Sequence, residues 1–166
     1  MTQSDPYYPP AAFYFEVTMR GESGVSGGKS ELDGAFQEVS GLDREIEFEE
    51  VREGGQNLFA HRLPKRPKHG NLVLKRGVVT KTSKLAEWAE ATLTSVLSTP
   101  VELKEVTVTL LAKTGQPLVW WTFADAYPVK WVTAPLNATE AAIAVETLEI
   151  TYSWVKRTVG KEPPPA

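Results

Sequence analysis

The stretch Phe36-Gln37-Glu38-Val39-Ser40-Gly41-Leu42 decides the fold class, because it reads as a short strand that ends in a glycine turn. Three further segments join it: Glu50-Val51-Arg52-Glu53-Gly54-Gly55, Asn71-Leu72-Val73-Leu74-Lys75-Arg76-Gly77, and Trp121-Thr122-Phe123 with Ala126-Tyr127-Pro128-Val129-Lys130-Trp131. Each is a strand or a strand end with a turn. None contains a catalytic motif, so the sequence points to a protein that works by assembling.

Length and composition indicate one globular domain. The chain has 166 residues, 42% of them hydrophobic, which is enough for a hydrophobic core. Its formal net charge of -3 gives no overall attraction to nucleic acid or anionic membrane, and it has no cysteine for disulfides or thiolate zinc sites. Because residues 1–12 lack an apolar signal region, we expect synthesis in the cytoplasm without a signal peptide, and no membrane binding by the chain itself.

The pattern along the chain predicts a mainly β domain over residues 13–158. Strands are expected at 13–19, 35–39, 45–51, 71–76, 101–112, 117–124, 126–132 and 143–155, where apolar and polar residues alternate. Glycine-rich residues 21–34 and the charged residues 52–70 are expected to be loops. Residues 1–12 should form an extended lead-in, and 159–166 a flexible tail.

One helix is predicted over about residues 83–98. Leu85, Trp88, Ala89 and Leu93 recur at helical spacing, and Ser83 is placed to cap the first turn. We expect seven or eight strands in a small antiparallel β-barrel or sandwich, closed or nearly closed, with this helix on its flank.

The residues that could carry chemistry lack a catalytic or metal-binding context. His61 and His69 are the only histidines, and the cationic residues between them would repel a metal. No nucleophile elbow or phosphate-binding loop is present. Glu45, Glu47 and Glu49 share one strand face, which is more typical of a solvated or interfacial surface than of an acid–base pair. We therefore expect no enzyme activity, no metal and no cofactor.

Opposite charges lie on adjacent segments. Residues 43–53 hold six acidic residues against two arginines, and residues 62–76 hold six basic ones. These charges could form a contact between identical subunits, or they could neutralise each other within one subunit. The basic run has no interleaved aromatic residue for base stacking, so specific nucleic-acid binding is not expected.

Trp120 and Trp121 are adjacent, so in a strand they face opposite sides. One can enter the core, and the other is expected to be exposed in a single subunit unless the helix or an interface covers it.

The order and spacing of the four opening segments resemble the tail-tube family of contractile phages and phage-tail-like injection particles, over residues 13–152. The resemblance implies a barrel-like fold with a flanking helix, hexameric rings joined edge to edge, and a sheet that continues around a hollow bore. It also implies a structural protein. The segment before Asn71 resembles the stacking loop of this family.

Within that family, the long first turn and the loop 57–66 look more like the baseplate-proximal paralogue than the repeating tube subunit. The favoured role is therefore a tube initiator, with a repeating tube subunit as the alternative and a nucleic-acid-binding β-barrel as a second alternative. The expected partners are other copies in the ring, neighbouring tube rings, and spike, hub and baseplate proteins, with any sheath contact indirect.

Two sets of residues follow as site hypotheses. Ring-stacking or hub contact is expected from the charged residues Glu49, Glu50, Arg52, Glu53, Arg62, Lys65, Arg66 and Lys68. A conduit should have a polar lining, and the polar faces of two strands supply Glu105, Thr107, Thr109, Thr147, Glu149 and Thr151 as lumen-facing residues, with a mildly acidic character.

Overall fold

The computed structural model describes residues 13–21, 31–51, 59–78, 83–95, 100–135 and 144–159. This part of the chain contains ten strands and one helix. They are β1 (Phe13–Arg20), β2 (Glu31–Phe36), β3 (Glu38–Ser40), β4 (Arg44–Val51), β5 (His61–His69), β6 (Leu72–Gly77), α1 (Lys84–Thr94), β7 (Lys104–Ala112), β8 (Pro117–Thr133), β9 (Val145–Thr151) and β10 (Trp154–Val159).

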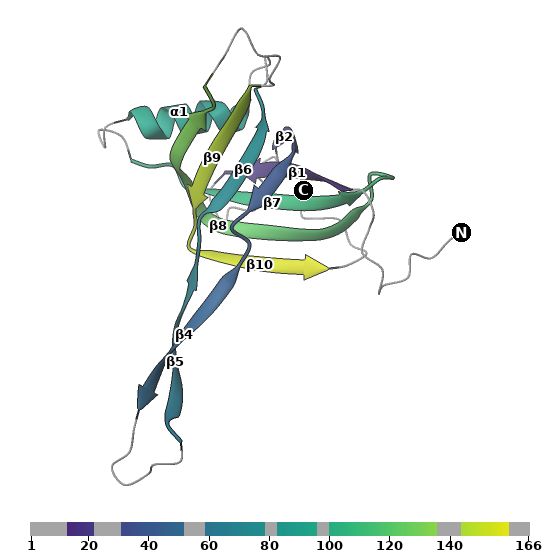
Figure 1. The fold of residues 1–166 in the computed structure, drawn as a ribbon. Coiled ribbons are helices and arrows are strands. Elements are labelled where there is room, and N and C mark those ends of the chain that lie inside the picture. Colours follow the sequence, from purple (N-terminus) through teal and green to yellow (C-terminus); the bar gives the residue numbers. More distant parts are fainter. Residues whose placement is uncertain are drawn as a thin grey trace.

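Eight strands form one antiparallel sheet, and β4 and β5 form a separate two-stranded ribbon. The order in the sheet is β2-β1-β7-β8-β9-β6-β3, with β10 also paired to β8. Figure 1 shows β6 and β9 crossing the direction of β8 and β10, with the ribbon projecting away from the sheet. The sheet is not closed into a barrel, because the end strands β2 and β3 do not pair with each other among the described residues, so of the expected barrel or sandwich only the closed form is wrong.

Strand β8 runs without a break through both strands expected at 117–124 and 126–132. The reason is a β-bulge at Asp125, which has a positive φ of 52°. Val106 pairs with Phe123 and Lys104 with Ala126, so three steps along β8 oppose two along β7. The bulge absorbs this extra residue, so Phe123 and Ala126 both face the core although they are three positions apart.

The strand expected at 143–155 is two strands. Within the described part, β9 ends at Thr151, and β10 starts at Trp154 after a turn at Tyr152 and Ser153. The two strands have different neighbours: β9 lies between β6 and β8, whereas β10 pairs only with β8.

Both expected loops are shorter than predicted. Strand β2 already begins at Glu31, within the first loop, and residues 22–30 lie outside the described part. In the second loop, residues 61–69 form β5, which pairs with β4. Pro64 and Pro67 argued against a strand, yet β5 tolerates them because it pairs on only one side. The rest of that loop up to residue 58 is likewise not described.

Helix α1 begins as predicted and ends early. The Ser83 hydroxyl accepts a hydrogen bond from the backbone N–H of Ala86 at 3.1 Å, which confirms the predicted N-cap. The helix ends at Thr94, where residue 98 was expected. Leu85, Trp88 and Ala89 are buried against the sheet, whereas Leu93 is 42% exposed, so only the first turns cover the core.

The core lies between α1 and one face of the folded sheet. It gathers Val106, Val108, Leu148, Ile150 and Tyr152 around Trp88. Val17, Met19, Phe36, Leu72, Leu74, Leu85, Ala89, Phe123 and Ala126 complete it.

The adjacent tryptophans do face opposite sides of β8. Trp121 packs against the core, and Trp120 pairs with Thr109 on the other face. Trp120 is nevertheless buried, so the expectation of an exposed tryptophan is wrong.

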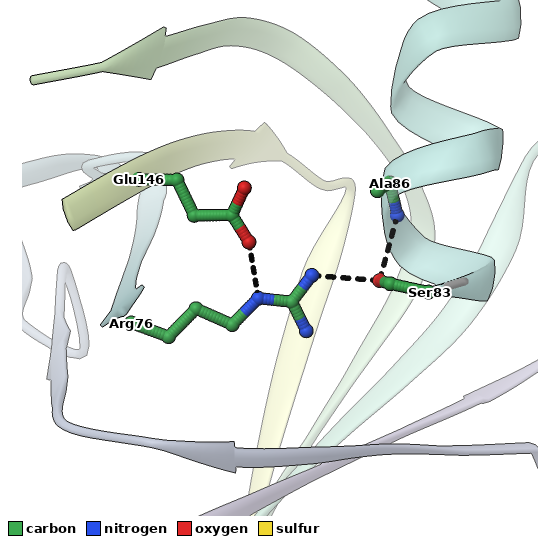
Figure 2. A network of polar contacts seen from close by, with 4 residues as sticks. All are labelled: Arg76, Ser83, Ala86 and Glu146. Atoms are coloured by element: carbon green, nitrogen blue, oxygen red, sulfur yellow. Dashed lines mark hydrogen bonds and ion pairs between the residues drawn. The ribbon is translucent and has the colours of Figure 1, made fainter. Parts of the chain in front are cut away.

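A buried polar network ties the start of α1 to the sheet (Figure 2). Arg76 on β6 is only 6% exposed, and its Nε donates to a carboxylate oxygen of Glu146 on β9. Its Nη2 donates to the Ser83 hydroxyl at 2.7 Å, the same oxygen that caps the helix. The guanidinium also lies over the Phe36 ring, 5.1 Å from its centroid. One arginine therefore links β2, β6, β9 and the helix N-terminus.

We expect Arg76→Met to lower the free energy of unfolding by about 3–5 kcal/mol, because it leaves the Glu146 carboxylate buried without its counter-charge. The matched control is Lys75→Met, which breaks the exposed ion pair with Glu38 and should cost about 0–1 kcal/mol. Urea unfolding of both variants measures the difference. Equal losses would show that the buried pair has no special role.

Candidate assembly interface

The ribbon of β4 and β5 is the most exposed feature of the described chain. Every residue of both strands is exposed. Figure 1 shows the ribbon extending well beyond the sheet. A two-stranded ribbon is only marginally stable by itself in water. Its side chains are accessible to another molecule along both strands.

One face of the ribbon is largely apolar. Ile46 lies opposite Pro67, and Phe48 lies opposite Pro64. Ile46 is 58% and Phe48 51% exposed. The Arg62 guanidinium covers part of the Phe48 ring, 4.7 Å from its centroid. Apolar side chains grouped on a projecting ribbon are typical of a surface that another protein covers.

Opposite charges meet across the two strands. The distances between nitrogen and oxygen are 2.6 Å for Lys68 and Glu47, 3.3 Å for Arg62 and Glu50, and 3.6 Å for Lys65 and Glu49. All these side chains are exposed. The sequence left open whether these charges pair between subunits or within one subunit. Pairing within one subunit is present in the single chain.

The structure brings together most of the residues predicted for stacking. Glu49, Glu50, Arg62, Lys65 and Lys68 all lie on the ribbon in cross-strand pairs. Arg66 is also exposed there, and no ion pair joins it to another described residue. Arg52 and Glu53 lie outside the described residues.

The pair of Glu47 and Lys68 shifts the titration of both groups. The hydrogen bond from Lys68, and then its charge, hold the pKa of Glu47 below its usual 4.5. The same partner raises the pKa of Lys68 above 10.5. The stabilisation from Glu47 is therefore complete above pH 4.5 and is lost as the pH falls through its lowered pKa. The contribution from Lys68 is complete below pH 10.5 and is lost as the pH rises further.

The two histidines are not brought together. His61 pairs with Val51 and His69 with Arg44, at opposite ends of β5. They are eight positions apart along the strand, which corresponds to roughly 26 Å. Among the described residues there is also no group of three or more metal-ligating side chains.

The residues predicted to face a bore lie on two polar sheet faces. On β7, Thr107 lies between Thr18 and Thr122, and Glu105 pairs with Arg20. Thr107 and Thr109 are only 4% and 3% exposed within the single chain. That they face a lumen remains a prediction.

On β9, Thr147, Glu149 and Thr151 are half-buried, opposite to the inward residues Leu148 and Ile150. Glu149 accepts from Lys130 at 2.9 Å, and Glu38 accepts from Lys75 at 2.7 Å on the same face. These lysines balance the acidic charge that the sequence led us to expect.

Sequence reasoning missed the contacts that join the ribbon to the sheet. Arg44 donates to the Val155 carbonyl at 2.7 Å, and the His69 ring stacks on Tyr152. It also missed that β10 is an edge strand. Tyr152 and Trp154 continue the alternation of β9, so no change of period marks the turn between them.

Replacing Lys68 with methionine should raise the pKa of Glu47 back toward 4.5, because the hydrogen bond and the charge that lower it are both removed. Carboxyl-carbon NMR titration of the two proteins measures this shift. Lys65→Met is the control and should have a much smaller effect, since its charge is the least of the four influences on Glu47. An unchanged Glu47 titration in the Lys68 variant would contradict the cross-strand pair.

Comparison with known proteins gives a family match over almost the whole chain. Residues 11–156 match the family model described as T4-like virus tail tube protein gp19. No curated protein sequence matches the chain. Among the described residues, no helix is both long and apolar enough to cross a membrane.

Several solved structures share the fold. A chain in the 6-fold symmetrised baseplate of the anti-feeding prophage is 30% identical, with a TM-score of 0.76, and the match covers 92% of this chain and 97% of that one. A chain in the sheath/tube terminator of the extracellular contractile injection system PVC is 25% identical, with a TM-score of 0.71 and coverage of 95% and 100%.

Hcp1 from Salmonella typhimurium, at 14% identity and a TM-score of 0.50, shares the fold alone, with coverage of 88% and 87%. Together, the mainly β fold, the single flanking helix and the match over residues 11–156 show that this chain belongs to the tail tube protein family, whose members are structural.

Proposed function

We propose that this chain is a tube initiator. In this role it forms a hexameric ring as the first tube layer of a contractile phage-tail-like injection particle, between the spike or hub and the repeating tube. The observation that carries the proposal is the similarity to a baseplate chain, at 30% identity over 92% of this chain. That baseplate structure is described as 6-fold symmetrised, which supports a ring of six here.

The alternative is a repeating tube subunit, supported by the 25% identity to a chain of a sheath/tube terminator. The two roles differ in how far assembly proceeds. A repeating subunit should polymerise alone at high concentration, whereas an initiator should stop at one or two rings. Electron microscopy of the concentrated protein separates them.

Open sheet edges support ring formation. Among the described strands, β10 pairs only with β8, and β2 and β3 end the sheet. An unpaired edge invites pairing with another chain, and a closed ring of subunits removes every such edge. In the C-terminal part of the sheet the open edge belongs to β10, since β9 is enclosed between β6 and β8. We therefore assign the ring contact to β10 and an edge strand of the next subunit.

The ribbon supports contact along the particle axis, with the neighbouring ring or the hub. It offers the apolar face of Ile46 and Phe48 together with the charges of the opposite strand. The half-buried polar face of β9, together with Glu105 of β7, would line the bore. The balanced charges around Glu149 and Lys75 suit a conduit, because a lining without net charge does not retain charged cargo.

Single prolines in β10 test the ring contact. Lys156→Pro and Arg157→Pro remove neighbouring amides that point to opposite sides of the strand. The variant whose lost amide faces away from β8 should keep its fold and lose ring formation, because only the ladder to the next subunit is broken. Light scattering and circular dichroism measure the two properties. Normal rings from both variants would exclude β10 as the ring contact.

Charge reversal tests the stacking contact. The variant Arg62→Glu, Lys65→Glu, Arg66→Glu should not stack on its partner ring, and wild-type stacking should weaken with salt, since exposed pairs are screened over about 8 Å at physiological ionic strength. This variant also breaks two pairs within the ribbon.

The matched control adds Glu49→Lys and Glu50→Arg, which restores opposite charges across the ribbon. If the charge-reversal variant does not stack because these charges contact another ring, the compensated variant should not stack either. Recovery of stacking would assign these charges to ribbon stability alone. Cosedimentation with the partner ring measures both variants.

A further inference from the structure

The two chain segments that enter and leave the ribbon are pressed together at its base. Gly41 precedes β4 and has a φ of +80°, a conformation that favours glycine. A Cβ at this position would lie 1.8 Å from the carbonyl oxygen of Asn71, which precedes β6. This close approach fixes the spacing of the two segments. It leaves the direction of the ribbon to be set by other contacts.

Those contacts come from the first residue pair of the ribbon, Arg44 and His69. The His69 ring stacks on Tyr152, with 4.2 Å between centroids and 13° between planes. Tyr152 in turn packs edge-on against Phe123 in the core, at 4.8 Å. Arg44 Nη2 donates to the backbone carbonyl of Val155 on β10 at 2.7 Å.

Tyr152 is held there for packing. Its side chain is 5% exposed, and its hydroxyl has no hydrogen-bond partner among the described residues. Burying an unpaired hydroxyl costs stability, so what Tyr152 contributes at this position is the stacking surface of its ring. Beyond the first pair, every residue of β4 and β5 is exposed and gives the ribbon no buried support.

We propose that Arg44 and His69 are positioning residues, which fix the ribbon at a set angle to the edge strand β10 through Val155 and Tyr152. The His69 contact ends at the turn between β9 and β10 and the Arg44 contact ends on β10 itself, so the ribbon and the edge strand form one rigid unit. This arrangement has a consequence for assembly, which rests on the proposed ring and stacking contacts. A ribbon that is already fixed in direction loses less conformational freedom when the next ring binds.

The test measures one distance within one chain. The protein has no cysteine, so Val51→Cys on the ribbon and Glu90→Cys on α1 give two spin-label sites in the full chain. Labelled protein is diluted into excess unlabelled protein, so that each distance reports a single subunit. We expect one narrow distance. Arg44→Ala with His69→Ala should replace it with a broad distribution while the far-ultraviolet circular dichroism is unchanged.

Two further variants separate positioning from general ribbon stability. Lys65→Ala with Arg66→Ala changes the middle of the ribbon and should leave the distance narrow. His69→Phe in the Arg44 wild-type background keeps an aromatic ring on Tyr152 and should also stay narrow. A broad distribution in the unsubstituted chain, or a narrow one in the Arg44 and His69 variant, would overturn the proposal. Neither result depends on whether the protein forms rings.

Discussion

Strand β8 is the element on which the rest of the structure depends, because it is hydrogen-bonded along its whole length to other parts of the sheet. Its first half pairs with β7 and β10, and its second half pairs with β9. Through these partners it connects the N-terminal strands, the helix-covered core and the edge strand. The ribbon and the polar faces keep their positions only because β8 holds both halves of the sheet together.

The elements with a strong local signal could be predicted from the sequence. Ser83 and the spacing of Leu85, Trp88 and Ala89 located the helix. Its end could not be predicted, because Leu93 keeps the helical spacing although it does not reach the core. Strand β5 was missed because Pro64 and Pro67 exclude a central strand, and the sequence does not show that β5 pairs on one side only.

The sequence singled out charged residues that lie on the ribbon, but it did not show how they pair, and their role in stacking stays a prediction. The acidic and basic segments were visible as composition, but their pairing depends on a register that includes an irregularity between Ile46 and Phe48. The contacts at the base of the ribbon join residues that are far apart in the chain, such as Arg44 and Val155. No local pattern records such a contact, since it depends on how the whole sheet folds over.

The bulge at Asp125 separates the bend of strand β8 from the choice of side chains that face the core. A chain without this residue would still place Phe123 and Ala126 inward, because simple alternation gives the same pattern. It would lose the local bend and the added twist that a bulge introduces. The curvature of the strand is thus encoded separately from the set of side chains that form the core. Insertion or deletion of one residue could change the bend of a subunit without any change to its interior.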